Sequence, residues 1–89
     1  MPETRSLSDL GSVGPATIGD LSVLGITRVE QLRGQEAQVL YDRLCERTGT
    51  HHDICMLDVF AAAIAQAEDP DLPAEQRSWW WWSRVRKGG

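Results

Sequence analysis

The last eleven residues, WWWWSRVRKGG, combine four aromatic rings with positive charge. All four tryptophans of the chain stand in this row, and it is followed at once by three cations, Arg84, Arg86 and Lys87. Flat rings stack on unpaired bases and cations contact phosphates, so this composition is typical of a nucleic-acid-binding surface. Tryptophan and arginine are also over-represented in protein interfaces, which leaves a protein-docking face as the alternative.

The tryptophan row cannot serve one purpose only. Consecutive helical residues point about 100° apart, so four of them spread over roughly 300°, whereas a core accepts a sector of about 100–140°. Trp79 and Trp82 are nearly aligned in a helix, and we expect them to pack together against the core. Trp80 and Trp81 then point elsewhere, and we expect them to be exposed and available for binding.

A second candidate site is the turn in LGSVGPA, residues 10–16. Gly14 fits a position with backbone angles closed to other residues, and Pro15 fits the first residue of a helix. The amides of such a turn point outward at the positive end of the helix dipole, where a phosphate can bind. The candidate nucleic-acid contacts in this region are Ser12, Val13, Gly14, Ala16 and Thr17, with Arg28 as the nearest cation that follows them.

One cluster has the residue types of a metal site. Cys45, His51, His52 and Cys55 are zinc ligands by type and lie close together in the sequence. Their spacing matches no established zinc finger, and both cysteines fall on apolar helix positions, where a buried free cysteine is the commoner state. We therefore retain the four only as a weak zinc candidate and expect no resident cofactor.

Catalytic chemistry has little support in the sequence. A helical cysteine near a histidine could form a nucleophile, but no third orienting group or oxyanion site accompanies it. Asp58 interrupts an otherwise apolar helix. We expect it to pair with Arg43 or Arg47 of the preceding helix rather than to act as a catalytic carboxylate. The sequence therefore predicts that the protein is not an enzyme.

Charge is divided unevenly along the chain. Residues 1–76 hold five arginines against thirteen acidic residues, a net of −8, whereas residues 77–89 hold four cations and no acid. Such a basic end favours an anionic partner. No apolar run approaches the ~18 residues that span a bilayer, and the first ten residues lack the pattern of a signal peptide. We therefore expect a cytoplasmic protein without a membrane partner.

Hydrophobic periodicity predicts helices and no strands. Six helices are expected, at about residues 6–10, 15–24, 29–32, 35–48, 54–67 and 74–82. Thr27 and Glu30 fit a capping box, Gly49 fits a helix stop, and Asp53 fits the cap of the next helix. That next helix is apolar almost all round, which predicts that it lies at the centre of the fold with Phe60 in the core.

These elements predict a compact all-α bundle of about six helices, one domain over residues 1–89. The start, residues 1–5, is expected to be frayed, and residues 77–89 form a tryptophan-rich basic segment. The turn from Gly49 to Asp53 looks like a degenerate copy of the first hairpin. Two such hairpins with approximate two-fold symmetry would straddle a duplex and touch both strands. The second turn lacks a Gly-hydrophobic-Gly signature, so this double arrangement stays open.

Residues 7–26 resemble a helix-hairpin-helix motif, the module with which many DNA-repair proteins contact the nucleic-acid backbone. The stretches GPATIGDLSVLGI and YDRLCERTGTHHDICMLDVFAAAIAQA and the tryptophan-then-RK ending together resemble the bacterial pathogenicity locus family, over roughly residues 6–87. Members of that family are often labelled mitomycin resistance proteins or helix-hairpin-helix domain proteins. Two departures from the motif stand out. Ser12 occupies a position that is often glycine, and Ala16, Thr17 and Asp20 stand where lysine or arginine usually follows.

The leading hypothesis is a small protein that binds the nucleic-acid backbone weakly and without sequence preference. The hairpin amides would hold a phosphate, and Trp80, Trp81, Arg84, Arg86 and Lys87 would add stacking and charge. The alternative is a protein-interaction module that has lost the phosphate grip and docks a partner, or a second copy, through the tryptophan face. The acidic body and the missing lysines favour this alternative.

Overall fold

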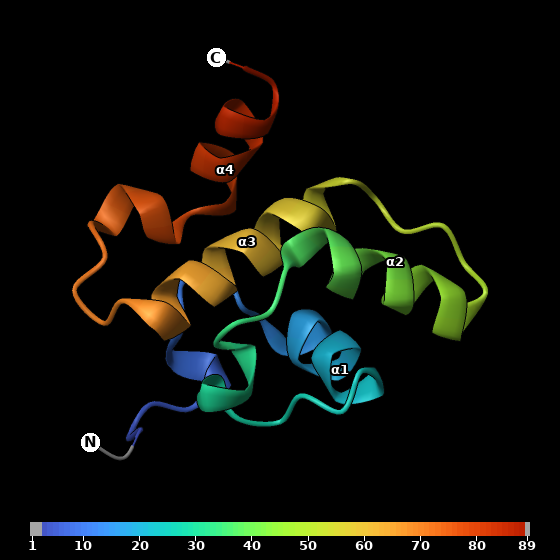
Figure 1. Ribbon diagram of the computed structural model, residues 1–89, viewed down its shortest axis with the longest axis horizontal. Helices are drawn as coiled ribbons and strands as arrows, with labels where there is room; N and C mark the ends of the chain where they lie inside the picture. The colour runs from blue at the N-terminus through green and yellow to red at the C-terminus, as the bar shows by residue number, and fades with distance from the viewer. Residues whose placement is uncertain (1–2, 89) are drawn as a thin grey trace.

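Helix α3 (Cys55–Glu68) runs through the centre of the molecule, and the other elements pack around it. The computed structural model describes residues 3–88, and in these residues all regular structure is helical. The remaining elements are α1 (Pro15–Val23), α2 (Ala37–Thr48), α4 (Trp79–Arg86) and three short 3-10 helices, η1 (Leu7–Asp9), η2 (Val29–Leu32) and η3 (Ala74–Arg77). In Figure 1, α4 lies on one side of α3 and α1 on the other, with α2 alongside. The all-α expectation is confirmed, with four α-helices and three 3-10 helices in place of about six helices.

The central position of α3 follows from its composition. Phe60, Ala62, Ala63 and Ala67 are fully buried, and the small alanine side chains let neighbouring elements approach closely on several sides. Phe60 is therefore in the core, as its place in the apolar stretch predicts. The core also takes side chains from every element that precedes α3: Leu7, Leu10, Val13, Leu21, Leu24, Ile26, Val29, Leu32, Leu40, Tyr41 and Leu44.

Local signals set most of the helix ends. Gly49 follows α2 in the left-handed conformation, with φ 66°, and stops the helix as expected. The Asp53 carboxylate accepts a hydrogen bond from the Cys55 amide (2.9 Å) at the start of α3. The expected capping box at η2 is shifted by one residue. The side chain of Gln31, rather than that of Glu30, accepts hydrogen bonds from the amides that precede the helix.

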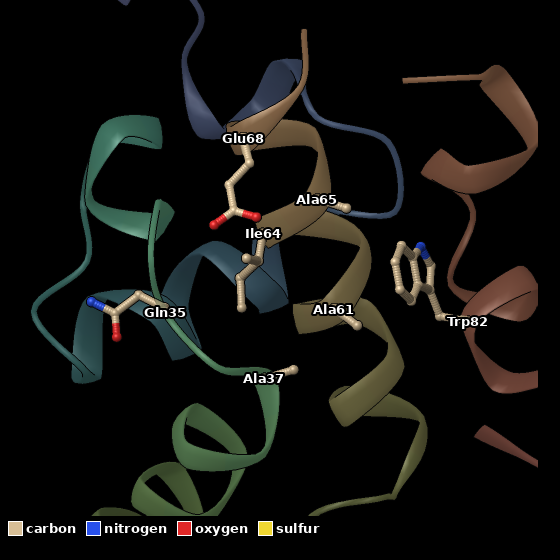
Figure 2. A pocket seen from close by; sticks show the side chains of 7 residues that line it. All are labelled: Gln35, Ala37, Ala61, Ile64, Ala65, Glu68 and Trp82. Atoms are coloured by element: carbon tan, nitrogen blue, oxygen red, sulfur yellow. The ribbon is translucent and has the colours of Figure 1, made fainter. Parts of the chain in front are cut away.

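The C-terminal segment differs from its prediction. A single helix was expected from residue 74 through the tryptophans, but Ser78 has extended backbone angles (φ −95°, ψ 133°) and separates η3 from α4. Helix α4 packs against α3, with Ser83 buried between them. Figure 2 shows the ring of Trp82 turned toward Ala61 and Ala65 of α3, across an open groove of about 200 Å³.

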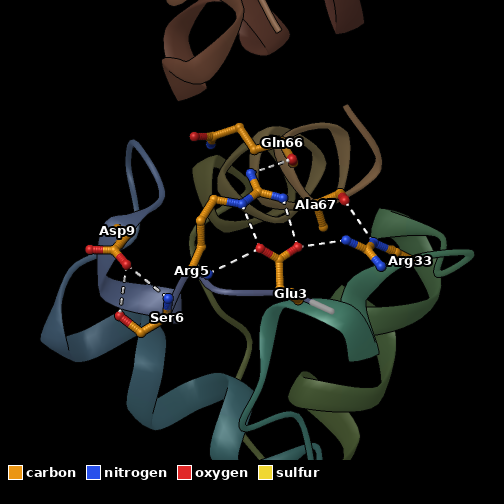
Figure 3. A network of polar contacts seen from close by, with 7 residues as sticks. All are labelled: Glu3, Arg5, Ser6, Asp9, Arg33, Gln66 and Ala67. Atoms are coloured by element: carbon orange, nitrogen blue, oxygen red, sulfur yellow. Dashed lines mark hydrogen bonds and ion pairs between the residues drawn. The ribbon is translucent and has the colours of Figure 1, made fainter. Parts of the chain in front are cut away.

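The start of the described chain is tied down rather than frayed. The Glu3 carboxylate lies between two guanidinium groups and forms ion pairs with Arg5 (2.9 Å) and Arg33. Each arginine also donates to the carboxyl end of α3, Arg5 to the Gln66 carbonyl (2.8 Å) and Arg33 to the Ala67 carbonyl (2.9 Å), as Figure 3 shows. These contacts place the N-terminal segment on the last turn of α3. Residues 1 and 2, which the frayed-start prediction also covers, lie outside the described residues.

The turn that follows α2, the candidate for a degenerate second hairpin, connects two long helices. Between Gly49 and the start of α3 the chain is irregular. The Asp53 carboxylate accepts a hydrogen bond from the Cys55 amide, so this amide is not free to bind a phosphate. Within residues 3–88, no helix is both long enough and apolar enough to cross a membrane.

Candidate functional site

The first turn of the chain is built around Gly11. Its amide donates to the side-chain oxygen of Gln66 (2.8 Å), and its carbonyl accepts from the side-chain nitrogen of the same residue (3.0 Å). A Cβ atom at Gly11 would lie 2.9 Å from the carbonyl oxygen of Arg77, so the turn and η3 approach as closely as only glycine permits. Sequence reasoning missed Gln66, although a lone amide among the alanines of α3 is a visible signal for a buried polar contact.

Ser12 joins this turn to the tryptophan helix. Its hydroxyl accepts a hydrogen bond from the amide of Trp79 (2.9 Å) and donates one to the carbonyl of Arg77 (3.0 Å). Ser12 has φ 67°, the only positive value among the non-glycine residues of the described chain. The two candidate regions, 65 residues apart in sequence, are therefore adjacent in space.

Gly14 does not have the special backbone angles expected of it. It precedes α1 in an extended conformation (φ −103°, ψ −177°), and a Cβ atom there would meet nothing within 4 Å. The strained position of the turn is Ser12 instead. Among the other hairpin candidates, Val13 and Thr17 are buried and Ala16 is exposed in the first turn of α1. The amides of that first turn have no preceding helical carbonyl to bind.

The four tryptophans divide into two pairs, but not the expected ones. Trp79 and Trp80 are the exposed pair, with 39% and 45% of their surfaces accessible. Trp81 and Trp82 are half-buried and contact each other edge to face, with ring centroids 4.9 Å apart. The indole N–H of Trp82 donates to the carbonyl of Gln76 (2.8 Å). The expected exposure of Trp80 is confirmed. The expected pairing of Trp79 with Trp82 is wrong, because Trp79 is exposed and the half-buried ring of Trp82 contacts Trp81 instead.

The candidate cations have different surroundings. The guanidinium carbon of Arg84 lies 4.6 Å from the ring centroid of Trp80, and Lys87 is exposed. Arg86 instead makes two parallel hydrogen bonds of 3.0 Å to Asp58, a carboxylate that is 2% exposed. The Asp58 carboxylate is therefore paired with an arginine, as expected, but the arginine comes from α4 and not from α2. Its hydrogen bond to Asp58 raises the pKa of Arg86.

Two of the candidate sites, Arg28 and the Cys–His cluster, have surroundings unrelated to Ser12 and the tryptophans of α4. Arg28 forms an exposed ion pair with Glu30 (3.1 Å) beyond the far end of α1. In the Cys–His cluster, the His52 carbonyl accepts from the Tyr41 hydroxyl, and the imidazole of His52 lies 2.9 Å from the Thr48 hydroxyl. A hydrogen bond to Asp53 raises the pKa of the Cys55 thiol, which disfavours the thiolate that a metal needs.

The four candidate ligands, Cys45, His51, His52 and Cys55, are not gathered into a metal site. In the part of the chain that the structure describes, no group of three or more His, Cys, Asp or Glu side chains could hold a metal ion.

In the described residues, the fold and the site define a small all-helical protein whose first turn is bonded through Ser12 to the start of the tryptophan helix. The chain belongs to the pathogenicity locus family (Cdd1), whose family model matches residues 2–88. It is also 37% identical, over 81 residues, to a protein named mitomycin resistance protein McrB from Streptomyces lavendulae, and the match covers 91% of this chain and 73% of that relative. No solved structure gives a significant match.

Proposed function

We propose that the protein binds nucleic acid weakly and without sequence preference. The binding surface is the turn and first helical residues at 12–17 together with the outer face of α4, and we call it the joined surface. The observation that carries the proposal is the hydrogen bond from the Trp79 amide to the Ser12 hydroxyl. This bond brings the exposed aromatic and cationic residues of α4 close to the N-terminus of α1. In this proposal residues 7–26 are a helix-hairpin-helix motif whose first helix is the single 3-10 turn η1.

The hairpin half of the joined surface offers few backbone amides to a phosphate. Ala16 is exposed in the first turn of α1, so a phosphate could approach its amide, and the helix dipole adds partial positive charge there. The Gly11 amide, by contrast, is bound to Gln66 and cannot reach a ligand without breaking that contact. Because fewer amides remain than in a complete turn, the expected affinity is low.

The α4 half supplies most of the charge. Arg84 and Lys87 are exposed on α4 and directly after it, and α4 itself carries no acidic residue. Arg77 is exposed in η3, where its guanidinium donates to the Leu72 carbonyl (3.1 Å). Cations that neutralise phosphates release condensed counterions, so binding through them weakens as salt rises. The thirteen acidic residues lie outside this segment, and their repulsion is a further reason to expect weak binding.

A matched pair of charge substitutions tests the hairpin half. Ala16→Glu places a carboxylate at the start of α1, which favours the helix dipole but repels a phosphate. Val39→Glu makes the same charge change at an exposed position in the first turn of α2, away from the joined surface. In fluorescence anisotropy with labelled DNA at low salt, we expect Ala16→Glu to weaken binding and Val39→Glu to leave it nearly unchanged. Equal effects of the two variants would mean that net charge, and not the hairpin, governs binding.

A second candidate function is supported by one observation. Trp79, Trp80 and Val85 expose 39%, 45% and 50% of their surfaces, and exposed apolar side chains of this kind could dock a protein partner. This candidate predicts no DNA binding by the wild-type chain at low salt. It also predicts that Trp80→Ala abolishes association with a partner or a second copy in a manner that depends little on salt.

A further inference from the structure

We infer that the joined surface prefers single-stranded nucleic acid to duplex and holds one unpaired base against the ring of Trp80. This inference rests on the proposed function. It names the form of nucleic acid that the site would take and the residue that would distinguish the two forms.

Trp80 has the exposure and the neighbour that a stacking site needs. Its side chain is 45% accessible, and Arg84, one helical turn later, places its guanidinium 4.6 Å from the ring centroid. The guanidinium lies over the ring while nearly half of the residue stays accessible, so a base can stack on the open part of the ring or take the place of the guanidinium. A base stacked there would bring its phosphate close to Arg84, so one nucleotide would satisfy both residues.

The platform that carries Trp80 is held in place by other contacts. Trp82 is fixed by its hydrogen bond to Gln76 and by the ring of Trp81, and the Trp79 amide is bound to Ser12. Because its neighbours on both sides are anchored, Trp80 loses little backbone freedom when a base binds. Pre-organisation of this kind improves affinity without adding contacts.

Duplex offers this platform little. Within a duplex the faces of each base pair are covered by the adjacent pairs, so a tryptophan can stack only at an end or on an unpaired base. A second site that binds the phosphate backbone would compensate for the missing stacking on a duplex, but the turn after α2 does not supply one. The Asp53 carboxylate is bound to the first amide of α3, and that hydrogen bond lowers its pKa, so the negative charge is retained. A second strand would meet this carboxylate and not a free amide.

The charge of the surface fits a single strand of a few nucleotides. In the segment that follows residue 76, Arg77, Arg84, Arg86 and Lys87 are all exposed, and the ion pair of Arg86 with Asp58 leaves the other three to contact phosphates. Two to three phosphate contacts on a single strand predict that affinity falls roughly 7- to 20-fold between about 50 and 200 mM salt. That slope is small enough to distinguish this surface from an extended basic groove.

The experiment compares a labelled oligothymidylate with a blunt duplex of equal length, using the full chain. We expect the single strand to bind more tightly and to quench tryptophan fluorescence. Trp80→Ala should weaken single-strand binding roughly 5- to 150-fold, the range for losing one stacked base. Trp80→Phe, which keeps a ring, should recover part of the loss. Val39→Ala, at a residue with nearly the same exposure (44%) on α2, is the control and should change nothing.

The possible outcomes separate the inference from the proposed function. Salt-dependent binding of single strand and duplex with equal affinity would leave the function standing and overturn the single-strand preference. A single-strand preference that survives Trp80→Ala would overturn the assignment of the base to Trp80. Absence of binding to either form at low salt would refute the proposed function itself. The circular dichroism spectrum of Trp80→Ala must match that of the wild type. If it does not, the single-strand affinities of Trp80→Phe and Arg84→Gln decide whether Trp80 holds the base.

Discussion

Gln66 binds both backbone groups of Gly11, accepting from its amide at 2.8 Å and donating to its carbonyl at 3.0 Å. The same side-chain nitrogen lies 3.1 Å from the Ala62 carbonyl within α3, and the residue is 4% exposed. This single side chain therefore connects the central helix to the turn that begins the joined surface.

Removing that side-chain amide should destabilise the protein. Gln66→Leu keeps most of the volume but leaves the Gly11 amide and carbonyl without partners, which costs about 1–3 kcal/mol for each group that stays buried. Urea denaturation should show the lower free energy of unfolding. Gln38→Leu, at an exposed position of α2, is the control and should stay within about 0.5 kcal/mol of the wild type. A Gln66→Leu protein as stable as this control would show that water replaces the lost contacts.

The two glycines of the turn should respond oppositely to substitution. Gly11→Ala forces a Cβ atom to 2.9 Å from the Arg77 carbonyl, so the turn or η3 must shift and the melting temperature should fall. Gly14→Ser meets open space at ordinary backbone angles, and its hydroxyl can cap α1, so stability should be unchanged or higher by up to about 1 kcal/mol. Thermal unfolding of both variants checks this, and a destabilised Gly14→Ser would restore the original assignment of Gly14 as the special position.

Acid should weaken the contact between the N-terminal segment and α3. The hydrogen bonds and charge of Arg5 lower the pKa of Glu3 from 4.5 to about 2. A carboxylate with a lowered pKa contributes stability that is fully present above its ordinary pKa and is lost as pH falls toward the folded-state value. Wild type should therefore exceed Glu3→Gln in urea midpoint at neutral pH, and the gap should narrow by about pH 3. A gap that is constant across this range would show that Glu3 acts through shape and not through charge.

Two tryptophans of the row should behave differently on truncation. Trp82→Ala removes a half-buried ring that faces α3, together with its hydrogen bond to Gln76, and should lower the free energy of unfolding by up to about 3 kcal/mol. Trp80→Ala removes an exposed ring and one contact with Arg84, and should cost no more than about 1 kcal/mol. Denaturation curves of the two variants provide the comparison. The reverse order would mean that α4 is rotated relative to α3.

Two arginines, two residues apart on α4, form a matched pair. Arg86→Met leaves the 2% exposed Asp58 carboxylate without its partner, whereas Arg84→Met affects only the exposed ring of Trp80. The melting temperature should therefore fall clearly for Arg86→Met and little for Arg84→Met. Nucleic-acid binding should show the opposite order. If Arg86→Met melts like wild type, Asp58 must have found another cation.

The sequence predicts this fold best where the signals are local. The unbroken apolar stretch around Phe60 identifies the central helix, Gly49 marks the end of α2, and Asp53 marks the start of α3. Each of these depends on residues a few positions apart, where helix geometry and capping chemistry suffice.

Several of the errors involve the C-terminal segment and its distant partners. On either side of the break at Ser78, the Arg77 carbonyl accepts from the Ser12 hydroxyl and the Trp79 amide donates to it. The partner of Asp58 comes from α4, and Gly11 needs its small size because the Arg77 carbonyl is so close. Nothing near these positions in the sequence signals the contact. For the same reason Trp79 and Trp81 exchanged roles, because helical spacing gives the angles between rings but not which sector faces α3 or where the helix begins.

The bond between Ser12 and the start of α4 also bears on when the turn can take its shape during synthesis. A nascent chain that has exposed residues 12–17 but not yet Arg77–Trp79 lacks the hydrogen bonds that hold Ser12 at its positive φ. Such a chain can form α1, because that helix depends on local hydrogen bonds. The turn before α1 then lacks the Arg77 carbonyl and the Trp79 amide that bind the Ser12 hydroxyl in the complete fold. The finished turn is therefore a late product of translation, and a ribosome-bound or truncated chain that stops before residue 77 would not carry it.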